Sequence, residues 1–543
     1  MKEIWKKIES QPYLSVMMIA LFLRMIAVIF SQGYGMHDDH FLVIEAAQSW
    51  VDGYDYNSWL PWNQIDPRPE GHSFFYVGFH YILLSLFKIF GINSPLIKMQ
   101  IIRLLHALFS LLTVSLSYKI TELLSDRKTA FKVGLLMAAF WFMPFLSVRN
   151  LVEIFAIPFL MIGVYLIILA DKAANRNFKA KGFKLILLAG LITGIAFSIR
   201  FQTILFTGGV GLVLLIQKKW IDAILFGTGA LISIILFQSI VDIFVWGYPF
   251  AEFTEYVRYN IENRYSYLTG DWYMYILTLL GFFLFPLGIF LLFGYFRSWK
   301  KHLFIFLPSF IFLAFHSYFP NKQERFIFTI IPFVVILGMI GWENWIEKSV
   351  LRKKISNYGM ALFWIINTML LVLATTAYSK KARIEAMNYL SKFEVSDFLT
   401  ECTGDGKTVF MPRFYSGQWS NEFIIQASEN LNPDIYKNDI PTNELRKLYK
   451  YEVINALETP NVHKNSKQYI QSGDFRNIDF ILFVSANNLQ VRVDLMKDLY
   501  PELHFQYKAE PGLMDKIVTK LNPVNKNQEI FVYSTKAPVR RDR

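Results

Sequence analysis

Long uninterrupted runs of apolar residues constrain this chain more than any other feature. Twelve such segments fill most of the first 380 residues, at 12–31, 73–92, 97–124, 129–146, 152–170, 183–200, 203–217, 220–246, 271–296, 302–319, 326–345 and 357–378. A helix needs about 20 apolar residues to cross the hydrocarbon core of a bilayer. The sequence therefore predicts a polytopic α-helical membrane protein.

The distribution of positive charge predicts which loops face the cytoplasm. Basic residues concentrate in short cytoplasmic loops of membrane proteins, and here they occupy Lys2, Lys6 and Lys7 and the loops 171–184, 217–220, 297–301 and 347–354. The external side then receives 32–72, 147–152, 200–202, 247–270, 320–325 and the tail from 379. Because the short loops predicted to be cytoplasmic hold many of the basic residues, the net charge of +12 does not indicate a nucleic-acid partner. The first apolar run lacks a small-residue cleavage site, so we interpret it as a membrane helix and not as a removed signal peptide.

Twelve crossings would not agree with the predicted sides of the two ends of the chain. An internal N-terminus and an external C-terminus require an odd number, so we expect about 11 or 13 crossings. The conflict lies at 73–92 and 97–124, which separate an external loop from 125–128, predicted to be internal. Either 97–124 contains a second crossing or one segment is re-entrant.

The tail differs in character from the apolar region. Short β-like runs occur at 408–412, 479–485, 503–507 and 529–534, and 491–500 has helical spacing. We predict a membrane domain at 1–379, with a first external loop at 32–72, followed by a soluble α/β domain at 380–543. Cys402 is the only cysteine, which excludes an intrachain disulfide.

Unusual polar residues converge on the predicted external face. Ionisable groups are cheap at membrane ends and cost several kcal/mol at mid-depth. The stretch 35–50 contains His37, Asp38, Asp39, His40 and Glu45, and later external positions add Arg149, Asn150, Glu153, Arg200, Lys322, Glu324 and Arg325. Cations on this side oppose the positive-inside trend, and an anionic ligand at the membrane surface would explain them.

Simpler interpretations exist for most of these residues. The two aspartates could cap a helix, and His37 and His40 could bind a metal, although a third clear ligand is missing. Arg149 and Glu153 have the i, i+4 spacing of an ordinary ion pair, and Arg200 could extend toward the membrane surface. The cluster 322–325 is harder to explain this way, because a tight break between apolar segments would favour Gly, Asn or Ser.

The chain resembles the GT-C glycosyltransferases, most of all the lipid-phosphate-mannose-dependent α-mannosyltransferases of N-glycan and glycosylphosphatidylinositol-anchor assembly. Those proteins carry a His-Pro-Asp-Glu motif in the first external loop, followed by an aromatic residue and a Glu. MHDDHFLVIEAA (36–47) is similar to it through Asp38, Asp39, Phe41 and Glu45, whereas Met36 and His37 depart from it.

Four later stretches resemble the same family in order along the chain. PNKQERFIF (320–328) is similar to a His-Lys-Glu-x-Arg-Phe motif through Lys322, Arg325 and Phe326, while Asn321 and Gln323 replace the His and the Glu. SVRNLVEIF (147–155) resembles an Arg…Asn…Glu stretch, and SIRFQT (198–203) an Arg-Pro-Thr stretch. KTVFMPRFYSGQWS (407–420) is similar to a segment ending in Pro-x-Tyr-Ser.

The resemblance implies a GT-C fold and an inverting transfer of a sugar, mannose first, from a polyprenyl-phosphate donor to a glycan or lipid-linked acceptor. Asp38 is then the expected base and Asp39 the second choice. The phosphate falls to Arg200, Lys322 and Arg325, with Glu45, Arg149, Glu153 and Glu324 in support. Because protein cations can neutralise a phosphate, we expect no obligatory metal and no cofactor. Other GT-C pentosyl- or hexosyltransferases remain alternatives.

Two alternatives belong to other functional classes. A transporter or flippase for lipid-linked sugars would share the apolar helices and the external cations, but it would not need the acidic loop, and the sequence lacks paired short helices broken by Gly or Pro. A structural partner in an assembly is the second. The expected location is a bacterial inner membrane, with a cytoplasmic N-terminus and a periplasmic C-terminal domain.

Overall fold

The protein is described by a computed structural model that covers residues 10–69, 71–174, 179–402, 404, 409–427, 451–456, 478–497, 500–521 and 527–541. Internal contacts divide the chain into two compact units. The first comprises 1–31, 69–76 and 101–376, and the second comprises 32–68, 77–100 and 377–543. The domain boundary at 379 stays a prediction. Lys2, Lys6, Lys7 and part of the loop 171–184 lie outside the described residues.

Helices account for nearly all of the apolar segments. In the described residues, seven spans are long and apolar enough to cross a membrane. They are α2 (Pro12–Phe30), α6 (Pro95–Leu124), α9 (Val152–Phe155) with α10 (Ile157–Ala174), α11 (Lys179–Ile199), α13 (Trp220–Ile234) with η3 (Ile235–Ser239) and α14 (Ile240–Trp246), η4 (Glu324–Ile330) with α19 (Ile331–Ile346), and α20 (Val350–Thr375). The prediction of a polytopic helical membrane protein is thereby confirmed.

Shorter helices complete this part of the chain. The apolar ones are α5 (Phe74–Ile89), α12 (Thr203–Ile216), α16 (Met274–Phe283), α17 (Leu287–Arg297) and α18 (Leu303–Tyr318). The others are α7 (Arg127–Ala139), α8 (Met143–Ser147) and α15 (Ala251–Glu262).

The structure bears on the unresolved parity around 73–124. Pro95–Leu124 is one continuous helix of 30 residues, which excludes the first of the two alternatives, a second crossing within this run. A segment that does not cross is the alternative left. Helix α5 has 16 residues, which span about 24 Å at 1.5 Å per residue, less than the hydrocarbon thickness of about 30 Å.

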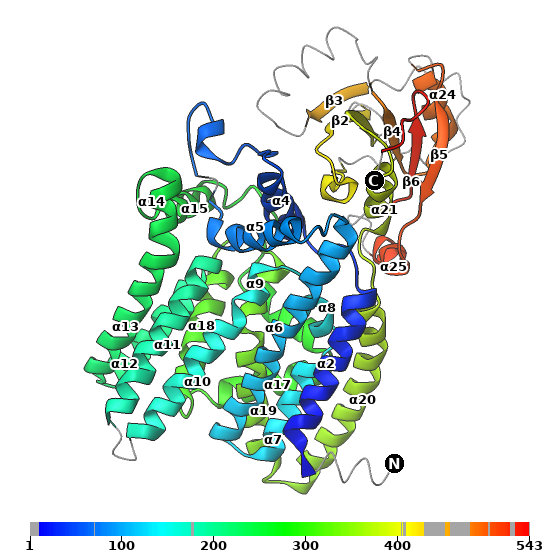
Figure 1. The fold of residues 1–543 in the computed structure, drawn as a ribbon. Coiled ribbons are helices and arrows are strands. Elements are labelled where there is room, and N and C mark those ends of the chain that lie inside the picture. The colour runs from blue at the N-terminus through cyan, green and yellow to red at the C-terminus, as the bar shows by residue number, and fades with distance from the viewer. Residues whose placement is uncertain are drawn as a thin grey trace. The chain divides into compact units, whose positions relative to one another are not determined.

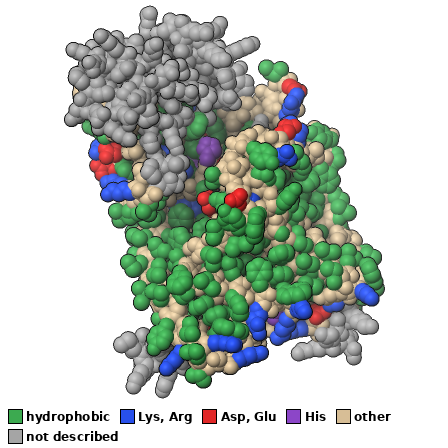
Figure 2. Space-filling view, turned by 180° about the vertical axis from the view of Figure 1, so that it is seen from behind, with side chains coloured by type: hydrophobic (Ala, Val, Ile, Leu, Met, Phe, Trp, Pro, Cys, Tyr) green, Lys and Arg blue, Asp and Glu red, His purple; other side chains and the backbone are tan. Residues whose placement is uncertain are grey.

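Close helix packing in the first unit depends on glycine. A Cβ atom on Gly294 of α17 would lie 1.9 Å from the carbonyl oxygen of Gly338 on α19, and one on Gly190 of α11 would lie 2.1 Å from that of Phe226 on α13. Helices in lipid associate through close backbone approach at small residues, because lipid tails remove the hydrophobic drive between helices. Figure 2 shows hydrophobic side chains over the helical face, with Lys and Arg gathered at one end.

The second unit contains a mixed β-sheet (Figure 1). In the described residues it has six strands, in the order β3 (Tyr451–Ala456), β2 (Asn421–Ala427), β1 (Asp397–Glu401), β4 (Phe480–Val484), β6 (Ile530–Ser534) and β5 (His504–Ala509). Strand β1 runs parallel to both β2 and β4, with Leu399 opposite Phe423 and Ile481. The remaining neighbours are antiparallel.

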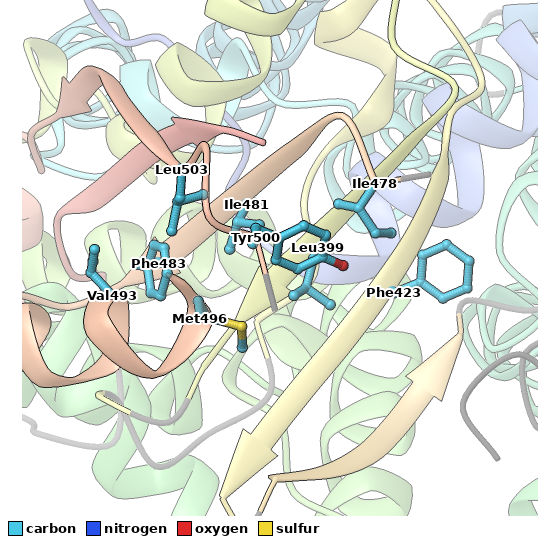
Figure 3. Packing of buried hydrophobic residues seen from close by; sticks show 9 residues of the cluster. All are labelled: Leu399, Phe423, Ile478, Ile481, Phe483, Val493, Met496, Tyr500 and Leu503. Atoms are coloured by element: carbon cyan, nitrogen blue, oxygen red, sulfur yellow. The ribbon is translucent and has the colours of Figure 1, made fainter. Parts of the chain in front are cut away.

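In the described part of 377–543, the α-helices are α21 (Lys381–Leu390), α24 (Leu489–Lys497) and α25 (Leu513–Leu521). Every residue of β4 is buried, as expected for a central strand covered on both faces. Figure 3 shows part of the core, in which Val493 and Met496 of α24 pack against Leu399, Ile481 and Phe483. This sheet with its helices agrees with the predicted C-terminal α/β character.

Sequence patterns found half of the strands. The runs at 479–485, 503–507 and 529–534 form β4, β5 and β6, and 491–500 overlaps α24. The strand expected at 408–412 is wrong for residues 409–412, which have no regular structure, and residue 408 lies outside the described residues. Strands β1, β2 and β3 were missed, because DFLTE and NEFIIQA mix charged and apolar residues without clean alternation.

Candidate active site

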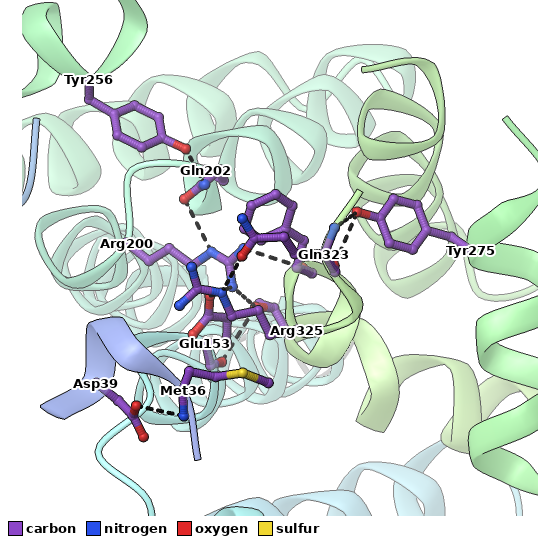
Figure 4. A network of polar contacts seen from close by, with 11 residues as sticks. Met36, Asp39, Glu153, Arg200, Gln202, Tyr256, Tyr275, Gln323 and Arg325 are labelled. Atoms are coloured by element: carbon purple, nitrogen blue, oxygen red, sulfur yellow. Dashed lines mark hydrogen bonds and ion pairs between the residues drawn. The ribbon is translucent and has the colours of Figure 1, made fainter. Parts of the chain in front are cut away.

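The acidic stretch after α2 folds into three consecutive helical elements. They are α3 (His37–Asp39), the π-helix η1 (His40–Glu45) and α4 (Ala46–Val51). Asp39 is buried, and its carboxylate accepts the backbone N–H groups of Met36 at 2.8 Å and Gly35 at 3.3 Å (Figure 4). The simple helix-cap interpretation therefore describes Asp39. Asp38, its half-buried neighbour, remains the first choice for the base.

The two histidines have aromatic neighbours. His37 stacks on Phe41, with ring centroids 4.4 Å apart. His40 is fully buried and lies parallel to Tyr34 at 4.6 Å and to Tyr415 at 5.4 Å. Across the described ranges, no three His, Cys, Asp or Glu side chains are grouped so that they could hold a metal ion. Exposed His37 and buried His40 thus both contact aromatic rings, and the metal interpretation finds no third ligand in the described part of the chain.

Glu45 joins the π-helix to a short segment far along the chain. Its Oε1 accepts the backbone N–H of Phe414 at 3.0 Å and lies 3.3 Å from Nε2 of His40. Phe414 belongs to the 3₁₀ helix η5 (Arg413–Ser416), inside the motif predicted at 407–420. The two stretches that resemble family motifs at 36–47 and 407–420 are therefore in direct contact within the second unit.

An aromatic stack adds a second connection between the same two stretches. The Tyr56 hydroxyl donates to the carbonyl of Phe41 in the π-helix at 2.5 Å, and its ring stacks on Trp419 at 5.6 Å. The guanidinium of Arg413 lies over Tyr56 at 5.0 Å, and Trp419 Nε1 donates to Asp52 at 2.9 Å. Sequence reasoning did not single out Arg413, although it directly follows the proline of the motif segment.

Two arginines, the buried Arg200 and the half-buried Arg325, form the centre of a polar cluster in the first unit (Figure 4). Nη1 of Arg200 lies 3.1 Å from Oε1 of Glu153, and Nε of Arg325 lies 3.8 Å from the same oxygen. Glu153 and Arg200 are 2% and 4% exposed, so this charge pairing is shielded from water. Three predicted residues from three separate stretches are thus brought together.

Two glutamines orient the arginines. Nε of Arg200 donates to Oε1 of Gln202 at 3.1 Å, and Nε of Arg325 donates to Oε1 of Gln323 at 2.9 Å. Gln202 in turn contacts the hydroxyl of Tyr256 on α15, and Tyr275 of α16 exchanges hydrogen bonds with the backbone of Gln323 at 3.2 Å. Sequence analysis gave neither glutamine a role, although it noted Gln323 as a departure from the family motif. Their signal was the placement of each two residues from an arginine in a predicted external break.

Burial shifts the pKa values of Arg200 and Tyr256 but leaves Arg200 positively charged. Desolvation lowers the pKa of the Arg200 guanidinium to about 9 and raises the pKa of the Tyr256 phenol to about 12. Arg200 is therefore still a cation at neutral pH, and Tyr256 is a neutral hydrogen-bond donor. A fixed positive charge in a dry site is the arrangement that favours an anionic ligand.

The structure gives Lys322, Glu324 and Arg149 different surroundings. Nζ of Lys322 is buried and donates to the carbonyl oxygens of His316 and Ser317 at 2.7 Å and of Phe319 at 2.5 Å, which caps the C-terminus of α18. Glu324 is exposed. Arg149 donates to the Ser31 carbonyl at 2.6 Å and so caps the C-terminus of α2.

A second buried network in the first unit fixes the residues that directly follow the predicted external loop 32–72. Glu252 accepts the Phe74 N–H at 3.0 Å and the Gln238 amide at 2.8 Å, and Ser73 donates to the Ser198 carbonyl at 2.5 Å. Burial, followed by the nearby carboxylate of Asp242, raises the pKa of Glu252 to about 8. Ser198 is two residues from Arg200, so this network holds the end of α11, which is directly followed by the arginine. Sequence reasoning missed it.

Comparison with solved structures identifies the class of fold. ArnT from Cupriavidus metallidurans bound to undecaprenyl phosphate is similar at 12% identity and a TM-score of 0.57, covering 97% of both chains, and its apo structure gives 0.56. The apo oligosaccharyltransferase of Archaeoglobus fulgidus matches 91% of this chain and 73% of its own, at 12% identity and a TM-score of 0.50. These similarities define the fold as that of the GT-C membrane glycosyltransferases.

The sequence places the chain within that class. Residues 15–416 match the Alg9-like mannosyltransferase family, so the chain belongs to this family and is an integral-membrane glycosyltransferase. A comparison with curated proteins found no match. The resemblance predicted from five short stretches is therefore confirmed over most of the chain.

Proposed function

We propose that this protein transfers a sugar, mannose first, from a polyprenyl-phosphate donor to a glycan or lipid-linked acceptor, with inversion at the anomeric carbon. One observation carries the donor assignment: Arg200 and Arg325, from separate stretches, converge on one buried carboxylate. Two fixed guanidinium groups suit a phosphate, because each offers a planar fork of donors. Membership of a mannosyltransferase family supports mannose as the first sugar to test.

The proposed reaction is a single displacement. The acceptor hydroxyl attacks the anomeric carbon while the bond from that carbon to the phosphate oxygen breaks, and the sugar changes hands with inversion. Asp38 takes the hydroxyl proton as general base. The departing polyprenyl phosphate gains negative charge, which Arg200 and Arg325 stabilise. Asp39 is the second choice for the base, since its carboxylate already caps its own helix.

The remaining predicted residues have supporting roles in this proposal. Glu45 holds the π-helix that follows Asp38, Arg149 caps α2, and Glu153 pairs with the arginines. Lys322 contributes positive charge, although its ammonium already has three carbonyl partners. Glu324 is exposed and would support the cluster from its solvent-facing side. We place the enzyme in a bacterial inner membrane, with the domain 380–543 on the periplasmic side.

The neighbours' ligands support a lipid donor in general terms. The ArnT structure contains undecaprenyl phosphate. A lipid-borne donor also fits a site built between apolar helices, since the polyprenyl chain can stay in the bilayer while its phosphate reaches the external face.

The test is transfer from labelled polyprenyl-phosphate mannose by the purified protein in lipid nanodiscs. Asp38→Asn should lower kcat by about 100-fold or more, because a carboxamide cannot take the proton. Asp66→Asn is the matched control, as Asp66 is an exposed aspartate of the same external loop, with 73% side-chain exposure. Near-normal transfer by the Asp38 variant would contradict the base assignment. In proteoliposomes, which separate two compartments, intact donor moved across the bilayer without transfer would instead identify a flippase.

A further inference from the structure

The cluster holds a negative charge, that of Glu153, between Arg200 and Arg325, and the need to orient the arginines does not explain it. The two arginines share one carboxylate oxygen, Oε1 of Glu153. The other oxygen, Oε2, is buried and has no hydrogen-bond partner in the described residues. A site intended only to attract a phosphate would not benefit from a buried negative charge between its cations.

Glu153 is not needed to aim the arginines. Nε of Arg200 and Nε of Arg325 are each held by a neutral amide oxygen, that of Gln202 at 3.1 Å and that of Gln323 at 2.9 Å. A glutamine at position 153 would offer the same kind of acceptor as well. What Glu153 supplies beyond a hydrogen bond is therefore one unit of negative charge.

We propose that Glu153 sets the selectivity of the site between donor and product. This inference rests on the proposed function. The donor is a phosphodiester with one negative charge, whereas the product, polyprenyl phosphate, is a monoester that approaches two at pH 8, because its second pKa is about 6. The arginines attract the product more strongly than the donor, and unopposed they would retain it.

The Glu153 charge repels both ligands in proportion to their charge. Its Coulomb penalty for a dianion is twice that for a monoanion at the same distance, so the affinity factor for the product is the square of that for the donor. Glu153 thus weakens the binding of the product more than that of the donor and favours release of the product. Glu153 acts here as a specificity-determining residue and takes no part in bond making.

Other ionisable groups lie near the cluster in the first unit. They are Lys322, His316 of α18, Tyr256 of α15 and Tyr275 of α16. All of these side chains are present both in the wild type and in a position-153 variant, and the two proteins are compared at the same pH. A ratio between the two proteins therefore isolates the contribution of Glu153.

The test uses two lipids that differ by one methyl group and one charge, polyprenyl phosphate and polyprenyl methyl phosphate. Their affinities for the full chain in nanodiscs are measured by competition with a fluorescent polyprenyl phosphate. At pH 8, Glu153→Gln should raise the affinity for the methyl diester about threefold. It should raise the affinity for the monoester about tenfold, which is roughly the square of the first factor. At pH 5, where the monoester carries about one charge, the two factors should converge.

Controls separate charge from folding. Glu153→Ala should give the same pair of factors, since it removes the same charge. Glu262→Gln removes a carboxylate that is 53% exposed in an ion pair with Arg258, and should change neither affinity by more than about twofold. Equal tightening of both lipids at pH 8, or no tightening of the monoester, would overturn the inference.

The two hypotheses fail separately in this design. Lipid binding needs no sugar transfer, so the charge factors can be read even if polyprenyl-phosphate mannose is not turned over. Absence of transfer with the predicted factors would count against the proposed reaction alone. If transfer occurs, Glu153→Gln should also show product inhibition at lower product concentration, about tenfold at pH 8.

Discussion

Oε1 of Glu45 accepts the backbone N–H of Phe414 at 3.0 Å, although 369 positions separate the two residues. Both belong to the second compact unit. Glu45 ends the π-helix that begins directly after Asp38 and Asp39, and Phe414 lies in η5. The contact makes a C-terminal segment part of the support for the acidic stretch, which assigns a structural role to residues beyond the helical region.

Glu45→Ala should therefore impair catalysis more than donor binding. The change leaves the buried Phe414 N–H unpaired, at a cost of about 1–3 kcal/mol, and loosens the helix next to Asp38. We expect kcat to fall about tenfold or more, because misplacement of a reacting group by about 1 Å is costly, while the donor KM stays near normal. Glu45→Gln keeps an acceptor oxygen and should recover most of kcat. An alanine variant with normal kcat would show that the contact does not position the base.

Arg325→Ala should weaken donor use and leave folding intact. Removing one charge-assisted contact costs about 1.5–3 kcal/mol, so the donor KM should rise about 10- to 100-fold. Arg258→Ala on α15 is the control, because that arginine is 48% exposed in pairs with Glu255 and Glu262. Unchanged donor kinetics in the Arg325 variant would remove the phosphate role from this residue.

Stability should decrease with pH through Glu422. Burial raises the pKa of this carboxyl from 4.5 to about 8, and its Oε1 accepts the hydroxyl of Thr400 at 2.8 Å. Between these values the folded state holds a proton that the unfolded state releases. The contribution is thus complete below pH 4.5 and is lost as pH rises toward 8, with a slope of at most about 1.4 kcal/mol per pH unit.

Glu422→Gln imitates the protonated acid and should flatten this dependence. Thermal unfolding of the full chain at pH 6 and pH 9 measures it, through the difference in Tm between the two conditions. A wild-type Tm that falls no more than that of the variant would contradict the assignment.

Chelation should leave transfer intact. Arg200 and Arg325 can neutralise the leaving phosphate, so we expect EDTA to change the rate by less than about twofold. The measurement is donor turnover with and without EDTA, followed by addition of Mg²⁺ or Mn²⁺. Loss of activity that either ion restores would mean that a metal supplies the missing charge.

The fold could be predicted from local sequence because its cause is local. Runs of about 20 apolar residues have to form helices in a bilayer, since the lipid offers no partner for an open backbone. The segments at 12–31, 183–200 and 357–378 match α2, α11 and α20 closely. Strands β1 and β2 escaped notice, because their residues are specified by neighbours across the sheet and not by their own alternation.

The polar residues show the same division. Sequence alone identified Glu153, Arg200 and Arg325 as polar groups in apolar surroundings, and grouped them by their predicted side of the membrane. Only the tertiary structure decided that the two arginines meet at one carboxylate, that Lys322 caps α18, and that Gln202 and Gln323 hold the arginines. The reason is physical: insertion in a membrane depends on the composition of each segment, whereas the partner of a buried charge depends on which segments pack together.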